Sequence, residues 1–198
     1  MDNLRWKLVE RQHLAQDQWI DFRKNIYELP DGSTIEPVYN YSKHSFSLIV
    51  PRTADGKYVC VRQYRHGIDE VTCEFPAGAI EYKDKGSDEP ITYDKIIATE
   101  QEAFAAAKRE LSEETGFVSD DWRHILTIPA NPTLSNSEMH IYAADNCRKV
   151  ADQELDISEF LNVELLSEQE LRERMFGGDF KQPHHILAWY LYRDNSLQ

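Results

Sequence analysis

The residues best suited to chemistry lie in one short acidic segment, residues 109–116, which reads Arg-Glu-Leu-Ser-Glu-Glu-Thr-Gly. If this segment is helical, each residue turns by about 100°, so Glu110, Glu113 and Glu114 share an arc of about 100° beside Leu111. Carboxylate oxygens are the ligands that Mg²⁺ and Mn²⁺ prefer. Acidic helix faces are also common simply because they are solvated. The segment therefore indicates either a divalent-metal site or an ordinary solvated face, and its spacing alone does not decide.

The helix that would position these carboxylates has clear signals at both ends. Thr99 and Glu102 have the spacing of a capping box, so Thr99 is the predicted N-cap. Gly116 stands where a helix-ending glycine belongs. Apolar residues recur between these ends at helical spacing and predict a buried stripe of Ala103, Phe104, Ala107 and Leu111.

Outside this helix the sequence predicts mostly strands. Runs rich in β-branched and aromatic residues predict strands at 6–9, 20–27, 34–41, 46–50, 58–64, 71–75, 124–128, 139–143 and 161–166. Two more helices are predicted at 167–175, where Ser167 and Glu170 again have capping-box spacing, and at 183–192. The charged, turn-rich residues 82–97 predict an exposed loop. This order of strands with few helices predicts a mixed α/β sandwich.

The composition excludes several classes of function. The 198 residues carry 22 basic and 35 acidic side chains, and the net charge of −13 disfavours nucleic acid and anionic membrane surfaces as partners. The cysteines Cys60, Cys73 and Cys147 form no CxxC pair and indicate neither a disulfide framework nor a zinc site. No apolar stretch predicts a signal peptide or a membrane span. We expect a reduced, cytoplasmic protein that needs metal cations to bind any anionic substrate.

Four segments of the chain occur together in a recognisable order. Gly78 followed by residues 109–117 pairs a glycine with the pattern R-E-apolar-x-E-E-x-G-apolar. Upstream of the acidic segment, residues 74–78, 61–65 and 29–32 read EFPAG, VRQYR and LPDG. Together these motifs resemble the Nudix hydrolase family, in its ADP-ribose pyrophosphatase and nucleotide-sugar hydrolase branch. The resemblance runs from about residue 16 to 192 and favours the metal site over the solvated face.

The resemblance also predicts the fold and the division of the chain. It implies an α/β (α+β) fold, a Nudix-type α/β/α sandwich with a mixed sheet, preceded by a small N-terminal β-rich segment. Residues 1–45 are expected to serve dimerisation and residues 46–198 to form the catalytic domain. Two departures stand out: Gly78 and Arg109 lie 31 positions apart, so residues 82–97 are an insertion, and Gln101 replaces the box's first Glu. Closing a longer loop costs only about 1 kcal/mol, so the fold should tolerate the insertion.

The family's chemistry implies a set of metal ligands. Nudix enzymes cleave a pyrophosphate with water and a divalent metal, here Mg²⁺ with Mn²⁺ as the alternative. Glu110 and Glu114 are the implied direct ligands, and Glu113 is a shared or outer one. The backbone carbonyl of Ala77 is a further implied ligand, and Arg109 is implied to orient Glu113.

Substrate contacts are implied for residues on several strands. Arg65 or Arg62 would bind a phosphate, and only one of them can, because alternate strand positions face opposite sides. Glu74 of the EFPAG motif is a further substrate-binding candidate. Trp19 matches a position where the family stacks an aromatic on the base, although packing on an edge strand explains it equally well.

The general base is predicted among carboxylates that follow the box. Glu159 and its neighbours Glu154 and Asp156 lie in one acidic loop, and Glu138 lies in another segment similar to the family's. Each could equally be a solvated carboxylate, because accepting a proton requires a geometry that sequence does not show. His184 and His185 are not predicted as a metal pair, since neighbouring helix residues point about 100° apart.

The predicted substrate is a nucleoside diphosphate-linked small molecule, either ADP-ribose or a nucleotide sugar, split into two monophosphates by a homodimer. A non-catalytic nucleotide-binding Nudix domain is the alternative, because the insertion and Gln101 depart from the box. Retention of the like-charged carboxylates on one helix face argues against a pure binder. A pyrophosphatase that removes damaged nucleotides is the least favoured class.

Overall fold

A computed structural model describes residues 3–81, 98–157 and 159–195 of the chain. The chain forms two compact units, one of Met1–Ser45, Glu81–Ala98 and Pro129–Glu138, and one of Phe46–Ile80, Thr99–Ile128 and Met139–Gln198. The predicted insertion at 82–97 lies outside the described residues. Among the described residues, no helix is long and apolar enough to cross a membrane.

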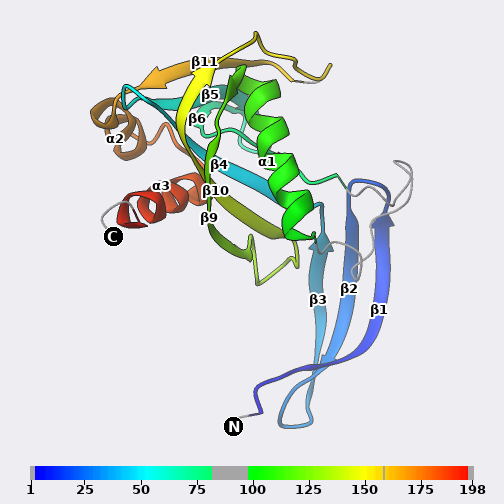
Figure 1. The fold of residues 1–198 in the computed structure, drawn as a ribbon. Coiled ribbons are helices and arrows are strands. Elements are labelled where there is room, and N and C mark those ends of the chain that lie inside the picture. The colour runs from blue at the N-terminus through cyan, green and yellow to red at the C-terminus, as the bar shows by residue number, and fades with distance from the viewer. Residues whose placement is uncertain (1–2, 82–97, 158, 196–198) are drawn as a thin grey trace. The chain divides into compact units, whose positions relative to one another are not determined.

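The first unit contains a three-stranded antiparallel sheet in the order β1-β2-β3 (Figure 1). Its strands are β1 (Lys7–Gln16), β2 (Asp21–Glu28) and β3 (Thr34–Ser42). Strand β1 extends well beyond the predicted residues 6–9. Nearly every residue of β1 is exposed. A strand without a buried face needs no alternation of apolar residues, and the second half of β1 has none that could mark it as a strand in the sequence.

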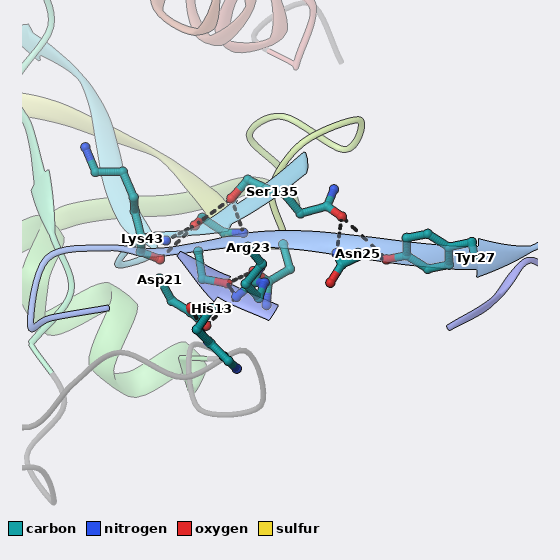
Figure 2. Close-up of polar contacts among 11 residues, drawn as sticks. His13, Asp21, Arg23, Asn25, Tyr27, Lys43 and Ser135 are labelled. Carbon is teal, nitrogen blue, oxygen red and sulfur yellow. Dashed lines mark hydrogen bonds and ion pairs between the residues drawn. The ribbon is translucent and has the colours of Figure 1, made fainter. Parts of the chain in front are cut away.

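Polar side chains fill the buried face of β2 (Figure 2). Asp21, Arg23 and Asn25 are each at most 1% exposed. The Arg23 guanidinium donates hydrogen bonds to Asp21 at 2.6 Å and to the Ser42 hydroxyl at 2.8 Å, and Nδ1 of His13 lies 2.6 Å from Asp21. Because buried charges are costly unless they are paired, the ion pair between Arg23 and Asp21 makes it possible to bury charge on a strand face that would ordinarily be apolar.

The second unit is built on a mixed sheet with helices on both faces, as Figure 1 shows. The sheet runs in the order β11-β5-β4-β10-β8, with β6 on β5, β7 on β4 and β9 on β10. Strands β4 and β10 are parallel, whereas the pairs β10–β8, β11–β5, β4–β5, β4–β7 and β5–β6 are antiparallel. The predicted mixed α+β fold is confirmed. The remaining strands and helices are β4 (Phe46–Thr53), β5 (Tyr58–Arg65), β6 (Glu70–Glu74), β7 (Ala77–Ala79), α1 (Glu100–Thr115), β8 (Phe117–Val118), β9 (Asp121–Pro129), β10 (Glu138–Lys149), β11 (Leu161–Leu166), α2 (Glu168–Phe176) and α3 (Pro183–Asn195).

Helix α1 begins and ends where the sequence predicts. The Glu102 N–H donates to the Thr99 hydroxyl at 3.2 Å, and the Thr99 N–H donates to the Glu102 carboxylate at 2.8 Å, which confirms the capping box. Gly116 ends the helix with a φ of 72°, a left-handed conformation that glycine adopts without strain. Phe104 is only half-buried, which corrects its place in the predicted stripe, because it lines an open cleft together with Trp122, against which its ring packs edge-on at 5.5 Å.

Two short strands were not predicted, and several ends differ. Strands β7 and β8 have only three and two residues, too few for any periodicity to reveal. Helix α2 has the predicted Ser167 capping box. Strand β10 is longer at its C-terminal end than predicted, where the polar residues 145–149 continue it.

Candidate active site

Two of the predicted carboxylates are buried side by side on α1. Glu110 and Glu114 are 6% and 3% exposed and lie one helical turn apart. Burial, followed by the charge of neighbouring carboxylates, raises the pKa of Glu110 to about 7 and that of Glu114 well above its ordinary value. The carboxylates of a solvated acidic face would be exposed. Because Glu110 and Glu114 are buried, the alternative of an ordinary solvated helix face is excluded for this pair.

Arg109 ties the carboxylate helix to the strand beside it. Its guanidinium donates to Glu110 at 2.6 Å, to Glu113 at 2.8 Å and to the backbone carbonyl of Ala79 at 3.0 Å. Arg109 is therefore an internal support of the carboxylates. Glu113 is more exposed, with 37% of its side chain accessible.

Strand β7 supplies the opposite wall of the carboxylate pair. The Ala77 N–H donates to the Glu114 carboxylate at 3.2 Å. A Cβ placed on Gly78 would lie 2.0 Å from the carboxyl carbon of Glu110, so only glycine leaves room for this carboxylate. The glycine of the EFPAG motif is explained by this close approach to α1.

The acidic loop after β10 is anchored to the end of α1. The Glu154 N–H donates to the Glu113 carbonyl at 2.9 Å, and the Gln153 amide donates to the Glu114 carbonyl at 2.6 Å. Glu159 lies near enough for its charge to contribute to the raised pKa values of Glu110 and Glu114. The side chain of Glu154 is exposed. Through this loop, the charge of Glu159 acts on the carboxylate pair.

Arg65 on β5 and Glu74 on β6 form an ion pair in the same unit as Glu110 and Glu114. Arg65 Nε donates to Glu74 Oε1 at 2.9 Å, and Arg65 Nη2 donates to Glu74 Oε2. Burial by itself would raise the pKa of Glu74, but the hydrogen bonds and charges of Arg65 and its other neighbours outweigh it and lower that pKa to about 2. The positive charge of Arg65 also partly offsets the raised pKa of Glu114.

The other predicted contacts lie elsewhere. Arg62 donates to Asp179 at 2.7 Å in a cluster with Glu164, so it has no place beside Glu110. Trp19, which is 66% exposed, and Glu138 belong to the first unit and stay predictions as parts of the site.

The NUDIX domain profile matches residues 43–190, about three quarters of the chain, and this range includes Glu110, Glu113 and Glu114. The chain belongs to the Nudix family. It is 27% identical over 165 residues to the ADP-ribose pyrophosphatase of Bacillus subtilis (strain 168), covering 82% of this chain and 79% of that protein. It is 25% identical over 169 residues to the methanol dehydrogenase activator of Bacillus methanolicus, covering 84% and 81% of the two chains.

The fold comparison agrees with this assignment. The crystal structure of an ADP compounds hydrolase superposes with a TM-score of 0.75 at 18% identity, over 98% of this chain and 96% of the other. The Nudix resemblance and the Nudix hydrolase class are thereby confirmed. Nudix hydrolases generally use divalent metals.

The departure at Gln101 does not touch the carboxylates of this Nudix hydrolase. Gln101 lies nine residues before Glu110 on α1, about 180° around the helix. It lines a separate cleft of about 330 Å³ with Glu100, Phe104, Trp122, His124 and Tyr142. Gln101 therefore lies on another face of α1 than Glu110 and Glu114.

The Arg65–Glu74 pair, in which the carboxylate is fully buried, predicts a specific dependence of stability on pH. Because the folded-state pKa of Glu74 lies near 2, below its ordinary value of 4.5, its contribution is complete above about pH 4.5 and is lost as the pH falls toward 2. Glu74→Gln should lower the free energy of unfolding at pH 7 by about 3–5 kcal/mol, since it leaves Arg65 without its charge partner. The difference from the wild type should shrink at pH 3.

Urea unfolding at both pH values measures this effect. Glu173→Gln, at an exposed carboxylate on α2, is the matched control and should change stability little at either pH. An equal loss at pH 7 and pH 3 for Glu74→Gln would contradict a role for the charge of this residue.

Proposed function

We propose that this Nudix hydrolase splits the pyrophosphate of ADP-ribose into AMP and ribose 5-phosphate with Mg²⁺. The observation that carries the proposal is the buried pair Glu110 and Glu114, packed against Gly78 and braced by Arg109. Similarity to the Bacillus subtilis ADP-ribose pyrophosphatase supports this substrate, and nucleotide sugars are the alternative.

The carboxylate pair fits a small divalent cation. Among the residues that the structure describes, no three His, Cys, Asp or Glu side chains gather into a complete metal cage. Mg²⁺ requires less, because it keeps several waters and commonly takes one or two carboxylates together with substrate phosphates. Glu110 and Glu114 would hold it, with Glu113 and the Ala77 carbonyl as further oxygen donors. When bound, the metal would neutralise the phosphate charge and polarise the attacked phosphorus.

Side chains of the protein then accept the proton of the attacking water and position the phosphate and the carboxylates. Glu159, whose charge acts on Glu110, accepts a proton from the attacking water, whose oxygen bonds to one phosphorus while the bond from that phosphorus to the bridging oxygen breaks. The bridging oxygen leaves on the second monophosphate. Arg65 binds a phosphate oxygen, and Arg109 keeps Glu110 and Glu113 in place.

Replacing Glu159 tests the assignment of the general base. Glu159→Gln should lower kcat for ADP-ribose by about 10²–10⁴-fold with KM nearly unchanged, because it removes the proton acceptor and keeps the shape. Glu154→Gln and Glu138→Gln are the matched variants, measured in the same steady-state assay. A loss for either of them that exceeds the loss for Glu159→Gln would move the base to that residue.

The three-stranded sheet of the first unit supports a homodimer. Among the residues that the structure describes, strand β1 pairs only with β2, and it exposes Leu8, Val9 and Leu14 by 39%, 54% and 45%. An exposed apolar edge strand favours pairing with another chain.

Light scattering tests the homodimer. We expect a mass of twice the 23.1 kDa chain for the wild type, and the mass of a single chain for the double variant that carries Val9→Lys and Leu14→Lys. Val150→Lys, at an exposed position of the second unit, should stay dimeric; a monomeric wild type would contradict the proposal.

The substrate is tested by a product assay with a panel of pyrophosphates. ADP-ribose, GDP-mannose, UDP-glucose and a dinucleoside polyphosphate are compared at equal concentration with Mg²⁺ and with Mn²⁺. The highest kcat/KM is expected for ADP-ribose. A clear preference for a sugar nucleotide would assign the chain to the alternative substrate class.

A further inference from the structure

The carboxylate of Glu74 is held from two separate parts of the chain. Besides the two hydrogen bonds from Arg65 on β5, it accepts one from the Thr72 hydroxyl. The Gln182 amide, just before α3, donates to Glu74 Oε2 at 2.9 Å. His185 Nε2 lies 3.7 Å from the same oxygen. Since Glu74 is fully buried, these side chains fix its orientation in place of water.

His185 is oriented by the backbone of the EFPAG motif. Its Nδ1 accepts a hydrogen bond from the Phe75 N–H at 3.0 Å, so in the neutral ring the proton is on Nε2. The ring also stacks on Phe75, with centroids 6.3 Å apart and an interplanar angle of 22°. The Nε2 proton consequently faces Glu74. Gln182, just before α3, thus donates a hydrogen bond to the buried carboxylate, and His185 in the first turn of α3 directs its Nε2 proton toward the same oxygen.

Arg65 is left with one edge of its guanidinium available. Glu74 takes Nε and Nη2, and Nη1 has no hydrogen-bond partner among the described residues. The Arg65 side chain is 36% exposed and interacts electrostatically with Glu114. A guanidinium clamped on one edge can offer its other edge to a phosphate in a fixed direction, with less rotational freedom to lose on binding.

We infer that Gln182 and His185 are positioning residues, which hold Glu74 so that Arg65 presents Nη1 to a phosphate of the substrate beside Glu114. The inference rests on the proposed function for the identity of the ligand. It gives α3, at the far end of the chain from the acidic helix, a role in substrate affinity that no motif of the sequence indicates.

A double-mutant cycle tests the route through Arg65. Gln182→Leu should raise KM for ADP-ribose by about tenfold and change kcat less than twofold, because a hydrogen bond to a charged group is lost away from the reacting atoms. Arg65→Ala should raise KM further, and adding Gln182→Leu to it should change KM less than twofold. Gln169→Leu removes a comparable Gln–Glu hydrogen bond on the surface of α2 and should leave KM unchanged.

His185 provides a rescue test. His185→Leu should raise KM and lower thermal stability, because the Phe75 N–H loses its acceptor, whereas His185→Gln can both accept from Phe75 and donate to Glu74 and should restore most of the affinity. A tenfold effect of Gln182→Leu that persists in the Arg65→Ala background would overturn the inference, as would an unchanged KM in Gln182→Leu.

A second readout separates this inference from the proposed substrate. Calorimetric binding of inorganic pyrophosphate with Mg²⁺ should weaken about tenfold in Gln182→Leu and not in Gln169→Leu. If the wild type fails to hydrolyse ADP-ribose and pyrophosphate binding still weakens, the proposed function fails and the positioning role stands. Equal pyrophosphate binding by the wild type and Gln182→Leu would overturn the positioning role whatever the substrate.

Discussion

Glu114→Gln should abolish most hydrolysis and at the same time stabilise the metal-free protein. The substitution keeps the shape of the side chain and an acceptor for the Ala77 N–H, but removes a carboxyl group that is 3% exposed and whose ionisation is opposed by burial and by Glu110. Loss of a carboxylate proposed to hold the metal should cost several kcal/mol of transition-state stabilisation, about 10³-fold or more in kcat. Relief of the buried repulsion should raise the melting temperature by about 2–4 °C per kcal/mol.

Two measurements and one control check this pair of opposite effects. Thermal unfolding in chelator reports the stability, and steady-state hydrolysis of ADP-ribose with Mg²⁺ reports the activity. Glu173→Gln removes an exposed carboxylate of α2 and should change neither quantity. A variant that loses activity because it melts at a lower temperature would show that Glu114 is structural.

Gly78→Ala should be nearly as damaging to activity, although it adds one methyl group. The new Cβ would lie 2.0 Å from both the carboxyl carbon and Oε1 of Glu110, so the carboxylate must move. Because β7 is paired with β4 through Gly78 and Ser47, the strand cannot easily move instead. We expect a loss of kcat of about 10²-fold, since small displacements of a catalytic group have such effects. Overpacking should also lower the free energy of unfolding by about 1–3 kcal/mol.

Gly67 offers a matched control for that substitution. A Cβ on Gly67 meets no atom within 4 Å, so Gly67→Ala should retain wild-type activity and stability. Raising the Mg²⁺ concentration should not restore Gly78→Ala, because the displaced carboxylate cannot return. Wild-type turnover by Gly78→Ala would mean that Glu110 has no part in the reaction.

The helix that carries the site could be predicted from sequence almost completely. Thr99, Glu102 and Gly116 mark its ends with local chemistry, and local hydrogen bonds decide such caps whatever the rest of the chain does. The choice between a metal site and a solvated face could not be made from spacing. It depended on the burial of Glu110 and Glu114, which results from strand β7 lying against α1.

Contacts between distant segments were beyond the reach of the sequence. Arg65 and Arg62 are equivalent in pattern, and only the partners Glu74 and Asp179 separate them. The hydrogen bond from Gln182 to Glu74 joins residues 108 positions apart, and no periodicity marks it. Local signals therefore predicted the elements, whereas the surroundings of each charged group required the fold.

The most direct test of the buried carboxylate pair as a metal-dependent hydrolytic centre is the release of AMP and ribose 5-phosphate from ADP-ribose by the wild-type protein. Products are quantified with Mg²⁺, after addition of chelator, and after Mg²⁺ is restored. We predict that both monophosphates form in equal amounts, that chelator stops their formation, and that restored Mg²⁺ resumes it. Hydrolysis that continues unchanged in chelator would contradict a metal centre at Glu110 and Glu114.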